Sequence, residues 1–588
     1  MYRGRHRGRT GRPLGAVALL LLVLSLVAGC SNAPPPPLVP PPPPGTKPSS
    51  SSLKPVTVEA VAGVDKLEGG FNPHTLADLS PTSAALSSLM LPSVFRPGPD
   101  GQPQLDSTLM ESAEVLPNTP KFTVRYKIRK AAGWSDGGPI AAEDFLYLWQ
   151  QMRSQPGVTN PAGYRVIDNI RSRQGGKTVD VTFSKPYPGW KTLFNNLLPA
   201  HLLKDDPRSW STALDSGYPA AGGPFMIWAI DKQRGEIILQ RNDRYWGPPA
   251  RSDRIVLRVN DQRKQVEQLR NGNSQLAVFN ADQGTMAQLR GLGPNFDLRT
   301  VPRPAVVQLL LRPSSPQLSD PLVRQAVEAG LDRRALTDAG TGGGPAEQLQ
   351  TRSQVLAPSQ PGYAQTAPPG PAATGADPQR MAKLLRQAGY QKVDGVWSRD
   401  GRPLNLVIAA AFDHKGSVKI AQTAARELQQ RGVQATAVTP NGDELFGEKG
   451  LAANPMTQNG DAADQVDMAV APRPVGGDPA AMLASAVGCP TQNPDTDQAY
   501  PYNPSGFCDE MLQPTITAAL TGKMPFPQAA GIVGDQLRAQ AVAMPLYQEA
   551  QVMASRKDVP GLAPGNGMAG PFSTAADWVG TPSNDDGY

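Results

Sequence analysis

The 588-residue chain is poor in the side chains that most often bind metals or attack substrates, since it has only three cysteines and four histidines. Three of the histidines, His74, His201 and His414, are far apart and lack the spacing of a metal-binding motif such as H-E-x-x-H. No glycine-rich segment carries the lysine and the serine or threonine that a phosphate-binding P-loop requires. These absences favour a non-enzymatic protein that needs neither a metal nor a cofactor.

The chain also has no excess of positive charge once its first residues are set aside. Lys and Arg number 57 against 51 Asp and Glu, but five arginines lie in the first twelve residues: Arg3, Arg5, Arg7, Arg9 and Arg12. Without these five, 52 basic residues face 51 acidic ones. Such a balance provides no basic surface for a phosphate backbone, so nucleic acid is not an expected partner.

The longest hydrophobic run, residues 14–27, has about 14 residues, fewer than the ~20 that a membrane-spanning helix needs. It follows an arginine-rich start, as in a secretory signal peptide, which we place at residues 1–29. The run ends in Val27-Ala28-Gly29-Cys30, which resembles a bacterial lipobox and predicts lipidation (diacylglycerol and palmitate) of Cys30. The alternative is an ordinary signal peptide followed by an incidental cysteine. A lipid on Cys30 would hold the exported protein on the outer face of the cytoplasmic membrane.

Residues 30–54 consist mainly of proline and serine. A segment of this composition cannot bury a core and favours polyproline II, which extends by about 3.1 Å per residue. We therefore predict a stalk between the lipid anchor and the folded part of the protein.

Cys489 and Cys508 remain as an even pair in an exported chain, which predicts a disulfide between them. This bond would close a loop of 18 intervening residues and stabilise the fold by about 3 kcal/mol. A redox role would need a closer spacing, so a structural role is favoured.

Two segments of the chain alternate strand and helix patterns, which predicts an α/β fold. In the first segment, apolar residues 255–259 and 276–279 predict strands, with a helix around Val266 and Leu269 between them. In the second, residues 404–411 and 433–438 predict strands that flank a helix capped by Ser417 and ended by Gly432. Such units build parallel sheets covered on both faces, and two separate units indicate two α/β lobes.

Local signals define further elements. Asp320-Pro321 and Asp377-Pro378 each predict the start of a helix, because Asp accepts hydrogen bonds from free N–H groups and Pro fits the first turn. The second of these helices is predicted to end at Gly389, and residues 340–376 are predicted to be a long loop. Residues 122–128 alternate as an antiparallel strand, before a helix with Phe145, Leu148, Trp149 and Met152 on one face.

One segment matches a catalytic motif. Residues 133–137 fit the G-x-S-x-G pattern of hydrolases, in which Ser135 would be the nucleophile. That motif requires a strand directly before it and a helix directly after it, whereas Gly138-Pro139 follows here. A turn is therefore favoured over a nucleophile.

Several motifs in order resemble the family 5 extracellular solute-binding proteins. They are residues 126–145 with Trp134-Ser135-Asp136-Gly137, residues 222–225, residues 241–247, residues 320–333 and residues 384–390. The resemblance implies a two-lobed fold like that of type II, peptide-binding periplasmic proteins, with a small domain inserted in lobe 1. The implied boundaries are 55–90 and 218–303 for lobe 1, 91–217 for the inserted domain, 304–550 for lobe 2, and 551–588 for a return to lobe 1 and a C-terminal tail.

The family implies ligand capture between the lobes, normally of peptides that are passed to an ABC permease. The lipobox, the proline stalk, residues 70–74 and residues 242–249 are similar to a mycobacterial lipoprotein branch of the family. That similarity implies binding of a phosphatidylinositol mannoside intermediate in phosphatidylinositol mannoside and lipoarabinomannan synthesis, with a membrane mannosyltransferase as a further partner. A peptide-binding component of an ABC importer is the alternative, and a hydrolase that uses Ser135 is a third.

Six residues are predicted to contact the ligand. Peptide binders of the family carry an Asp for the peptide amine after a strand like residues 466–470, whereas this chain has Pro472 and Arg473 there, followed by Asp478. Arg473 is predicted to meet an anionic head group; the alternative is a rigid loop with a solvated arginine. Phe279 and Asn280 follow one predicted strand, and Phe71 and Asn72 follow another, where α/β sheets bind ligands. For these four, ordinary loop packing is the alternative. Hinge motion is expected near residues 301–304.

Overall fold

A computed structural model of the 588-residue chain describes residues 58–64, 70–98, 101–366, 375–447, 449–453, 466–496, 498–559, 562, 570–579 and 581–582. The predicted signal peptide, Cys30 and the stalk lie outside these residues. Within the described part of the chain, no helix combines the length and apolar character needed to cross a membrane.

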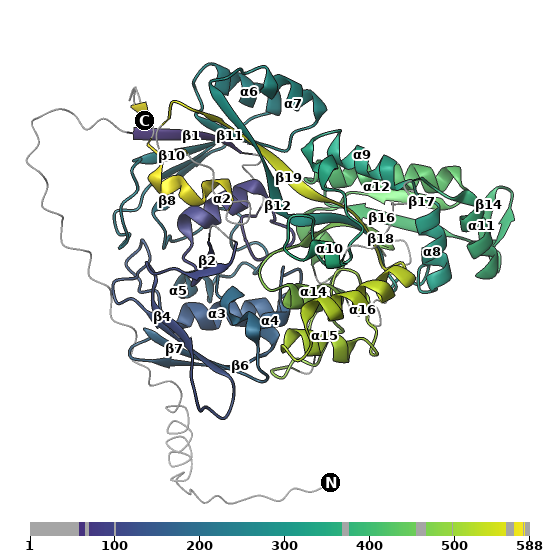
Figure 1. The fold of residues 1–588 in the computed structure, drawn as a ribbon, viewed down its shortest axis with the longest axis horizontal. Helices are drawn as coiled ribbons and strands as arrows, with labels where there is room; N and C mark the ends of the chain where they lie inside the picture. Colours follow the sequence, from purple (N-terminus) through teal and green to yellow (C-terminus); the bar gives the residue numbers. More distant parts are fainter. Residues whose placement is uncertain are drawn as a thin grey trace, which may run out of the picture. The chain divides into compact units, whose positions relative to one another are not determined.

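One large mixed sheet runs through both lobes (Figure 1). Its strands lie in the order β17 (Gln434–Val438), β16 (Asn405–Ala410), β18 (Met468–Pro474), β12 (Phe296–Leu311), β19 (Ala543–Arg556), β11 (Leu276–Phe279), β1 (Val58–Val64), β10 (Arg254–Val259), β9 (Glu236–Arg241) and β8 (Phe225–Asp231), with β20 (Thr581–Pro582) paired to β1. The α/β fold predicted from the sequence is confirmed.

The lobe 1 part of the sheet combines parallel and antiparallel pairing. β1 pairs in parallel with both β10 and β11, whereas β9 and β8 extend the sheet as antiparallel strands. The strands predicted at residues 255–259 and 276–279 are present as β10 and β11, and they are connected through α6 (Gln262–Arg270). α7 (Gln283–Arg290) follows β11, and η3 (Pro571–Asp577) packs against α2 (Pro81–Met90).

The lobe 2 part has β16 at its centre, paired in parallel with β17 and β18. Its predicted helix is α12 (Lys415–Gln430), which begins before Ser417, so the prediction that Ser417 is the cap is wrong. Ser417 lies buried within the first turn, and His414 precedes the helix without a side-chain cap. Gly432 has a left-handed φ of 89° just after the helix, as predicted.

Asp320 and Asp377 cap their helices as predicted, because each carboxylate accepts a backbone N–H of the first turn. Around the lobe 2 sheet lie α8 (Pro321–Ala329), α9 (Arg333–Thr341), α11 (Pro378–Gln387), α13 (Gly442–Phe446), α14 (Pro479–Val487), α15 (Gln513–Leu520), α16 (Phe526–Ala539), and a separate sheet of β13 (Gln391–Val393), β14 (Val396–Arg399) and β15 (Arg402–Pro403). The long loop predicted at residues 340–376 is only partly right, since it contains the end of α9, η2 (Pro345–Leu349) and α10 (Tyr363–Thr366).

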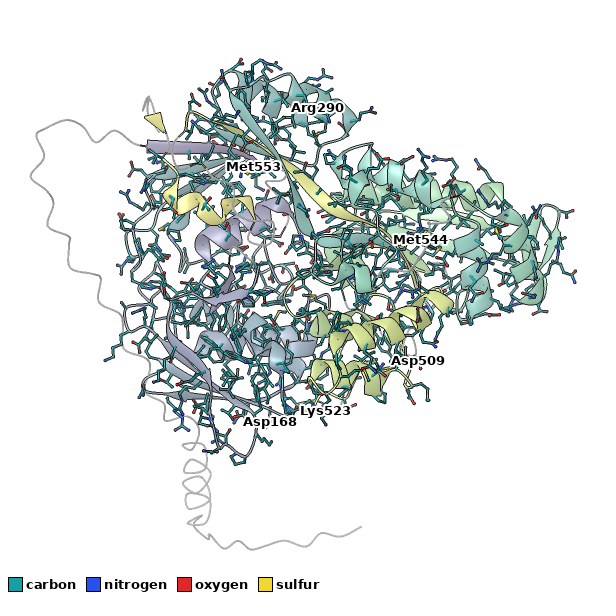
Figure 2. The ribbon with its side chains drawn as sticks, viewed as in Figure 1. Asp168, Arg290, Asp509, Lys523, Met544 and Met553 are labelled. Carbon is teal, nitrogen blue, oxygen red and sulfur yellow. A yellow bond between two sulfur atoms is a disulfide. The ribbon has the colours of Figure 1, made fainter. Side chains whose placement is uncertain are left out.

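β12 and β19 are the long strands that join the lobes. They pair with each other from Phe296↔Arg556 to Leu310↔Ala543, and β19 contributes Met553 to the core of lobe 1 and Met544 to that of lobe 2. Figure 2 shows these two methionines far apart along β19. Because one strand pair is packed into both cores, the lobes are connected by β-structure and not by a loose linker.

Residues 91–217 form elements of their own beside lobe 1. A four-stranded antiparallel sheet has the order β4 (Met110–Val115), β5 (Thr123–Ile128), β7 (Thr178–Phe183) and β6 (Ile167–Arg173), and β2 (Phe95–Pro97) pairs with β3 (Pro103–Leu105). The remaining elements are α3 (Ala142–Ser154), α4 (Ala162–Arg165), η1 (Pro188–Thr192) and α5 (Ala200–Leu203). The predicted antiparallel strand is β5, and the predicted apolar face of α3 is buried. The hydrophobic core of the residue 91–217 region is continuous with that of lobe 1.

Candidate functional site

A cavity of about 240 Å³ lies beside the strands that join the lobes. One wall is α2, which contributes Ser80, Pro81, Ser83, Ala84, Ala85, Ser87 and Ser88. The opposing strands contribute Val278, Val301, Pro302, Arg303, Pro304 and Gln551. Further lining residues are Pro73, Asp78, Leu79, Asn196, Gly570 and Phe572. The cavity is therefore built from segments of lobe 1, the connecting strands, the residue 91–217 region and the C-terminal segment.

The sequence of α2 explains why this helix can form a wall of the cavity. Ser80 caps the helix by accepting the N–H of Ser83 at 3.0 Å, and Pro81 occupies the first turn. Small residues recur at the helical spacing of three or four, whereas Leu86, Leu89 and Met90 are buried in the core of lobe 1. A helix with large residues on one face and mainly serine and alanine on the other leaves space beside it.

The connecting strands bend where they border the cavity. The pairing of β12 with β19 changes register between Pro302 and Val306, and Pro302 and Pro304 have no N–H to give to the ladder. Arg303 forms a 2.7 Å ion pair with Glu549 across this irregularity, and Gln548 donates to the carbonyl of Arg303 at 2.8 Å. This interruption lies where the sequence suggests a hinge.

Arg473 does not line the cavity. It lies in β18 opposite Val306, and its guanidinium is buried where it donates to the carbonyls of Val355 and Ser353. Burial lowers its pKa to about 10. The alternative of a solvated arginine in a loop is therefore wrong, because the side chain is only 6% exposed and holds residues 353–355 against the strands. Contact with an anionic head group stays a prediction.

The other predicted site residues also have protein partners. Asp478 caps α14 by accepting the N–H groups of Ala480 and Ala481 at 3.2 and 3.3 Å, and burial raises the pKa of its carboxyl. Asn72 is fully buried, where it accepts the N–H of His74 and donates to the carbonyl of Trp210. Phe71 belongs to the lobe 1 core. Neither Asp478, Asn72 nor Phe71 lines the cavity.

Phe279 and Asn280 differ from each other. Phe279 is buried in a cluster with α6 and α7, away from the cavity wall. Asn280 is exposed, and its side-chain oxygen accepts a hydrogen bond of 3.1 Å from the cavity residue Gln551. Two of the predicted ligand residues thus hydrogen-bond to the lining, Asn280 to Gln551 and Asn72 through its N–H to Asp78. Their role as ligand contacts stays a prediction.

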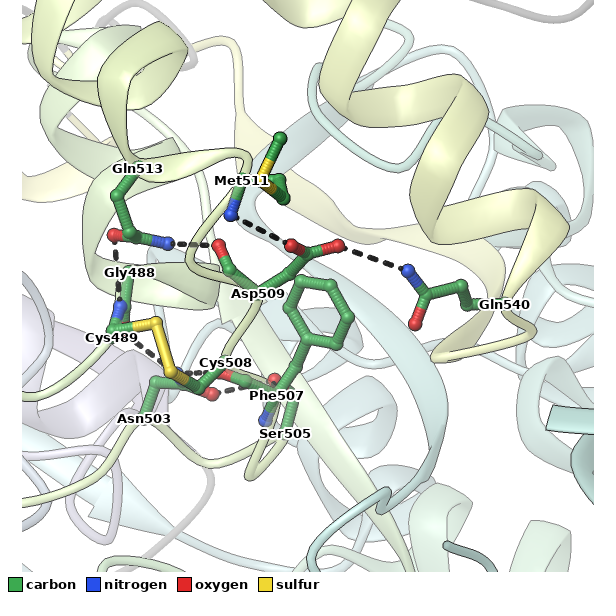
Figure 3. The surroundings of a disulfide bond; sticks show 10 residues. All are labelled: Gly488, Cys489, Asn503, Ser505, Phe507, Cys508, Asp509, Met511, Gln513 and Gln540. Atoms are coloured by element: carbon green, nitrogen blue, oxygen red, sulfur yellow. Dashed lines mark hydrogen bonds between the residues drawn. A yellow bond between two sulfur atoms is a disulfide. The ribbon is translucent and has the colours of Figure 1, made fainter. Parts of the chain in front are cut away.

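The predicted disulfide joins Cys489 and Cys508, as Figure 3 shows. Residues 490–507, which we call the clasp loop, are held at their base by Asn503, whose amide donates to the carbonyls of Gly488 and Phe507. The loop reaches the residue 91–217 region, where Asp495 pairs with Arg153 and the ring of Tyr500 lies 4.7 Å from the Arg165 guanidinium carbon. Arg165 also donates to the carbonyl of Pro501 at 3.4 Å.

A second contact between the lobes is apolar. Leu76 and Ala77 from lobe 1 are buried in a cluster with Leu445 and Phe446 of α13. Gly442 approaches Ala77 so closely that an added Cβ would lie 3.0 Å from the Ala77 Cβ and 3.1 Å from its Cα. In the described conformation, lobe 2 therefore contacts the residue 91–217 region through the clasp loop and lobe 1 through α13.

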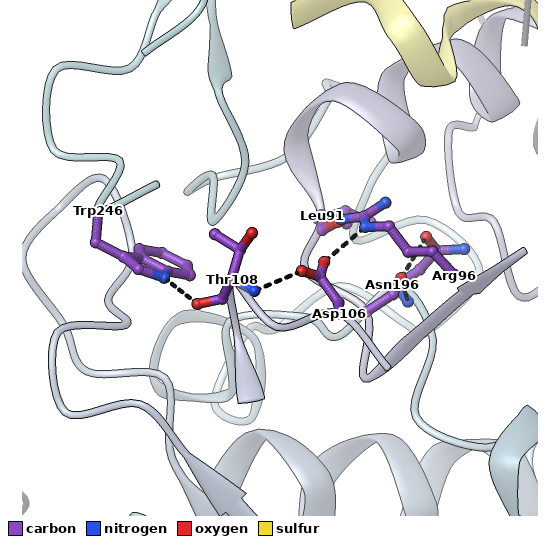
Figure 4. A network of polar contacts seen from close by, with 7 residues as sticks. Leu91, Arg96, Asp106, Thr108, Asn196 and Trp246 are labelled. Carbon is purple, nitrogen blue, oxygen red and sulfur yellow. Dashed lines mark hydrogen bonds and ion pairs between the residues drawn. The ribbon is translucent and has the colours of Figure 1, made fainter. Parts of the chain in front are cut away.

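The motifs at residues 133–145 and 241–247 have structural partners in the fold. The carboxylate of Asp144 accepts the N–H groups of Ala141 and Ala200 and the indole N–H of Trp134. Trp246 donates to the carbonyl of Thr108 at 2.7 Å, next to the Arg96–Asp106 ion pair (Figure 4). The Ser135 hydroxyl accepts the N–H of Ala221 within a turn, which supports the predicted turn.

The sequence profile of the bacterial extracellular solute-binding proteins, family 5 (middle region), matches residues 107–490. The chain belongs to this family. Its members are substrate-binding proteins, so the predicted family and the two-lobed fold are confirmed.

Two relatives and one solved structure are similar to this family 5 protein in sequence or fold. It is 34% identical, over 96% of its own length and 97% of the relative's, to a "probable monoacyl phosphatidylinositol tetramannoside-binding protein", LpqW, of Mycobacterium tuberculosis. It is 26% identical to the oligopeptide-binding protein OppA of Mycobacterium bovis, over 76% of this chain and 77% of OppA. The oligopeptide-binding protein AppA of Bacillus subtilis, solved with a nonapeptide, has the same fold with a TM-score of 0.68 and 16% identity over 90% of this chain and 100% of AppA.

Proposed function

We propose that this solute-binding protein binds a phosphatidylinositol mannoside intermediate and supports phosphatidylinositol mannoside and lipoarabinomannan synthesis. The carrying observation is the 34% identity to LpqW, which extends over nearly the whole of both chains. The identity to OppA is lower and covers about three quarters of each chain. A binding protein performs this role by holding the glycolipid, and no residue is assigned a catalytic step.

The geometry beside the hinge supports a ligand with an apolar part. The cavity has prolines, alanines, Leu79, Val278, Val301 and Phe572 on its wall. Peptide binders of the family usually place an Asp for the peptide amine after such a strand, and the end of β18 carries the buried Arg473 instead. Asp478, the next carboxylate along the chain, is engaged at the N-terminus of α14.

Lipidation at Cys30 is part of the same proposal. An exported protein anchored to the outer face of the cytoplasmic membrane would meet glycolipid intermediates where they are elongated. A membrane mannosyltransferase is then the expected recipient of the ligand. Under the alternative function, a peptide-binding component of an importer, an ABC permease takes that place. The 26% identity to OppA is the observation behind this second candidate.

The test offers both ligand classes to one preparation. We expect native mass spectrometry of the full chain in phosphatidylcholine nanodiscs to show a monoacyl phosphatidylinositol tetramannoside adduct and no adduct from an equimolar pool of peptides of two to nine residues. Phosphatidylinositol without mannose is the control for unspecific lipid binding. Peptide adducts without a mannoside adduct would overturn the proposal and support the importer function.

A further inference from the structure

We propose that the cavity beside the hinge binds the end of one acyl chain of the glycolipid, so that the mannosylated head group lies outside it. This inference rests on the proposed function and specifies which part of the ligand occupies which part of the protein. Three observations support it: the apolar lining of the cavity, the volume of the cavity, and the exposure of Ala84 on its wall.

The polar side chains of the wall already have partners in the protein. The hydroxyls of Ser87 and Ser88 donate to the carbonyls of Ala84 and Ala85 at 3.1 and 2.9 Å, and Ser80 and Ser83 share a 3.0 Å hydrogen bond. The remaining polar lining groups are engaged as well: Asp78 with the N–H of Asn72, Asn196 with Ser93, Arg303 with Glu549, and Gln551 with Asn280. Most of the other lining residues are prolines, alanines and larger apolar residues, so the wall offers a ligand mainly apolar surface.

This wall suits methylene groups better than sugars. Each mannose carries several hydroxyls, and a hydroxyl buried without a partner weakens binding by about five- to 150-fold. A methylene moved from water into an apolar site gains about 0.8 kcal/mol, which corresponds to about fourfold in affinity. Hydroxyl-rich mannose rings are thus disfavoured in the cavity, whereas an acyl chain gains with every carbon it inserts.

The size and access of the cavity agree with a chain end. Its volume of about 240 Å³ exceeds the ~150 Å³ of an apolar cavity that takes up benzene, so several methylenes fit. Ala84 projects from the middle of α2 into this space and is exposed, although its neighbours Ser83 and Ala85 are buried. A ligand can therefore reach the wall without unfolding α2.

Ala84 provides a substitution that fills the cavity with little effect on the core. In full-length protein in nanodiscs, we expect Ala84→Phe to weaken binding of monoacyl phosphatidylinositol tetramannoside at least tenfold, measured by titration with native mass spectrometry. Ala287→Phe makes the same change on an exposed face of α7, outside the cavity, and is expected to leave binding unchanged. Equal effects of the two substitutions would overturn the inference.

Binding of three ligands is compared to find which part of the glycolipid provides the affinity: the intact glycolipid, the deacylated head group and palmitate. The deacylated tetramannoside head group is expected to bind at least a hundredfold more weakly than the acylated ligand. Palmitate is expected to bind more weakly than the glycolipid and to lose affinity in Ala84→Phe. A head group that binds as tightly as the intact glycolipid would overturn the acyl assignment and leave the proposed function standing. Palmitate binding as tightly as the glycolipid would assign the cavity to free fatty acids, and failure of every mannoside would overturn the proposed function itself.

Discussion

His74 is a buried titratable residue next to the cavity residue Pro73. Its Nε2 lies 2.9 Å from the carbonyl oxygen of Asn196, and burial lowers its pKa to about 4. The unfolded chain therefore binds a proton near pH 6.5, whereas the folded protein binds it only near pH 4. The stability contributed by neutral His74 is present above pH 6.5 and is lost as the pH falls towards 4.

Asp144 has the opposite effect. Burial raises the pKa of its carboxyl to about 6, although two backbone N–H groups and the Trp134 indole favour the charged form. The folded protein thus holds this proton at a pH where the unfolded chain has lost it, and the stability from neutral Asp144 declines as the pH rises to 6. The two residues oppose each other between pH 4 and 6.

Substituting His74 should reveal its contribution. We expect the difference in unfolding free energy between wild type and His74→Asn to shrink by about 3 kcal/mol from pH 7 to pH 4. Only the wild type has a buried histidine whose protonation at low pH favours the unfolded chain. Urea unfolding of both proteins at the two pH values measures this difference. His414→Asn controls for the substitution itself, and a difference independent of pH would contradict the prediction.

At the scale of single elements, the clasp loop depends on a covalent bond for its position. The disulfide closes the loop, and the loop presents Tyr500 and Pro501 to Arg165. Without the bond, the loop gains conformational freedom in the unfolded state, and hydrogen bonds remain to hold its base in the folded state, from Asn503 to Gly488 and Phe507 and from the Cys489 N–H to Gln513.

We expect the double variant Cys489→Ser/Cys508→Ser to lower the unfolding free energy by about 3 kcal/mol and to speed amide hydrogen exchange in residues 498–503. Hydrogen exchange followed by mass spectrometry checks the second effect. Exchange in the lobe 1 strand β10 under native conditions is the internal reference. Unchanged protection of the clasp loop would show that the disulfide does not position it.

The sequence predicts elements well where a local rule decides them. The apolar runs of β10, β11, β16 and β17 and the Asp-Pro caps of α8 and α11 are visible without tertiary contacts. The cap of α12 is predicted wrongly because serine is a common cap, yet tertiary packing starts the helix at Lys415 and buries Ser417. The helical turns within residues 340–376 are hidden by their glycines and prolines.

The candidate site is harder to predict because tertiary packing, and no local rule, brings its residues together. Its wall combines small residues of α2 with Val301–Pro304, Asn196 and Phe572, which are distant in sequence and belong to no motif. Strand ends are a topological guide to ligand sites, yet they nominate Phe71 and Phe279, whose side chains fill cores. The serine and alanine spacing on α2 is the one local signal, and it becomes informative only when the facing strands are known.

On the scale of the whole molecule, the Arg153–Asp495 ion pair connects α3 with the clasp loop of lobe 2. Arg153 also lies over the Trp149 ring, with its guanidinium carbon 4.1 Å from the ring centroid. Partly exposed pairs contribute up to about 1 kcal/mol, which corresponds to about fivefold in the ratio of closed to open protein.

Reversing one charge should therefore open the lobes. We expect Arg153→Asp to increase the radius of gyration in small-angle scattering, and the exchange Arg153→Asp/Asp495→Arg to restore the wild-type value. The same exchange at Arg334 and Asp338, an exposed pair within α9, is the matched control. A double variant that stays as open as Arg153→Asp would show that the charge pair does not hold the lobes together.

The pairing of β20 with β1 has a consequence for biogenesis. Glu59 lies opposite Thr581, so the first strand of lobe 1 finds this neighbour only when nearly the entire polypeptide has been made. Until lobe 2 has been made, Val58 and Glu59 lack this neighbour, although β10 and β11 already lie beside the rest of β1. Because β19 and β20 come from the C-terminal end of the chain, lobe 1 completes its sheet last although its synthesis begins first.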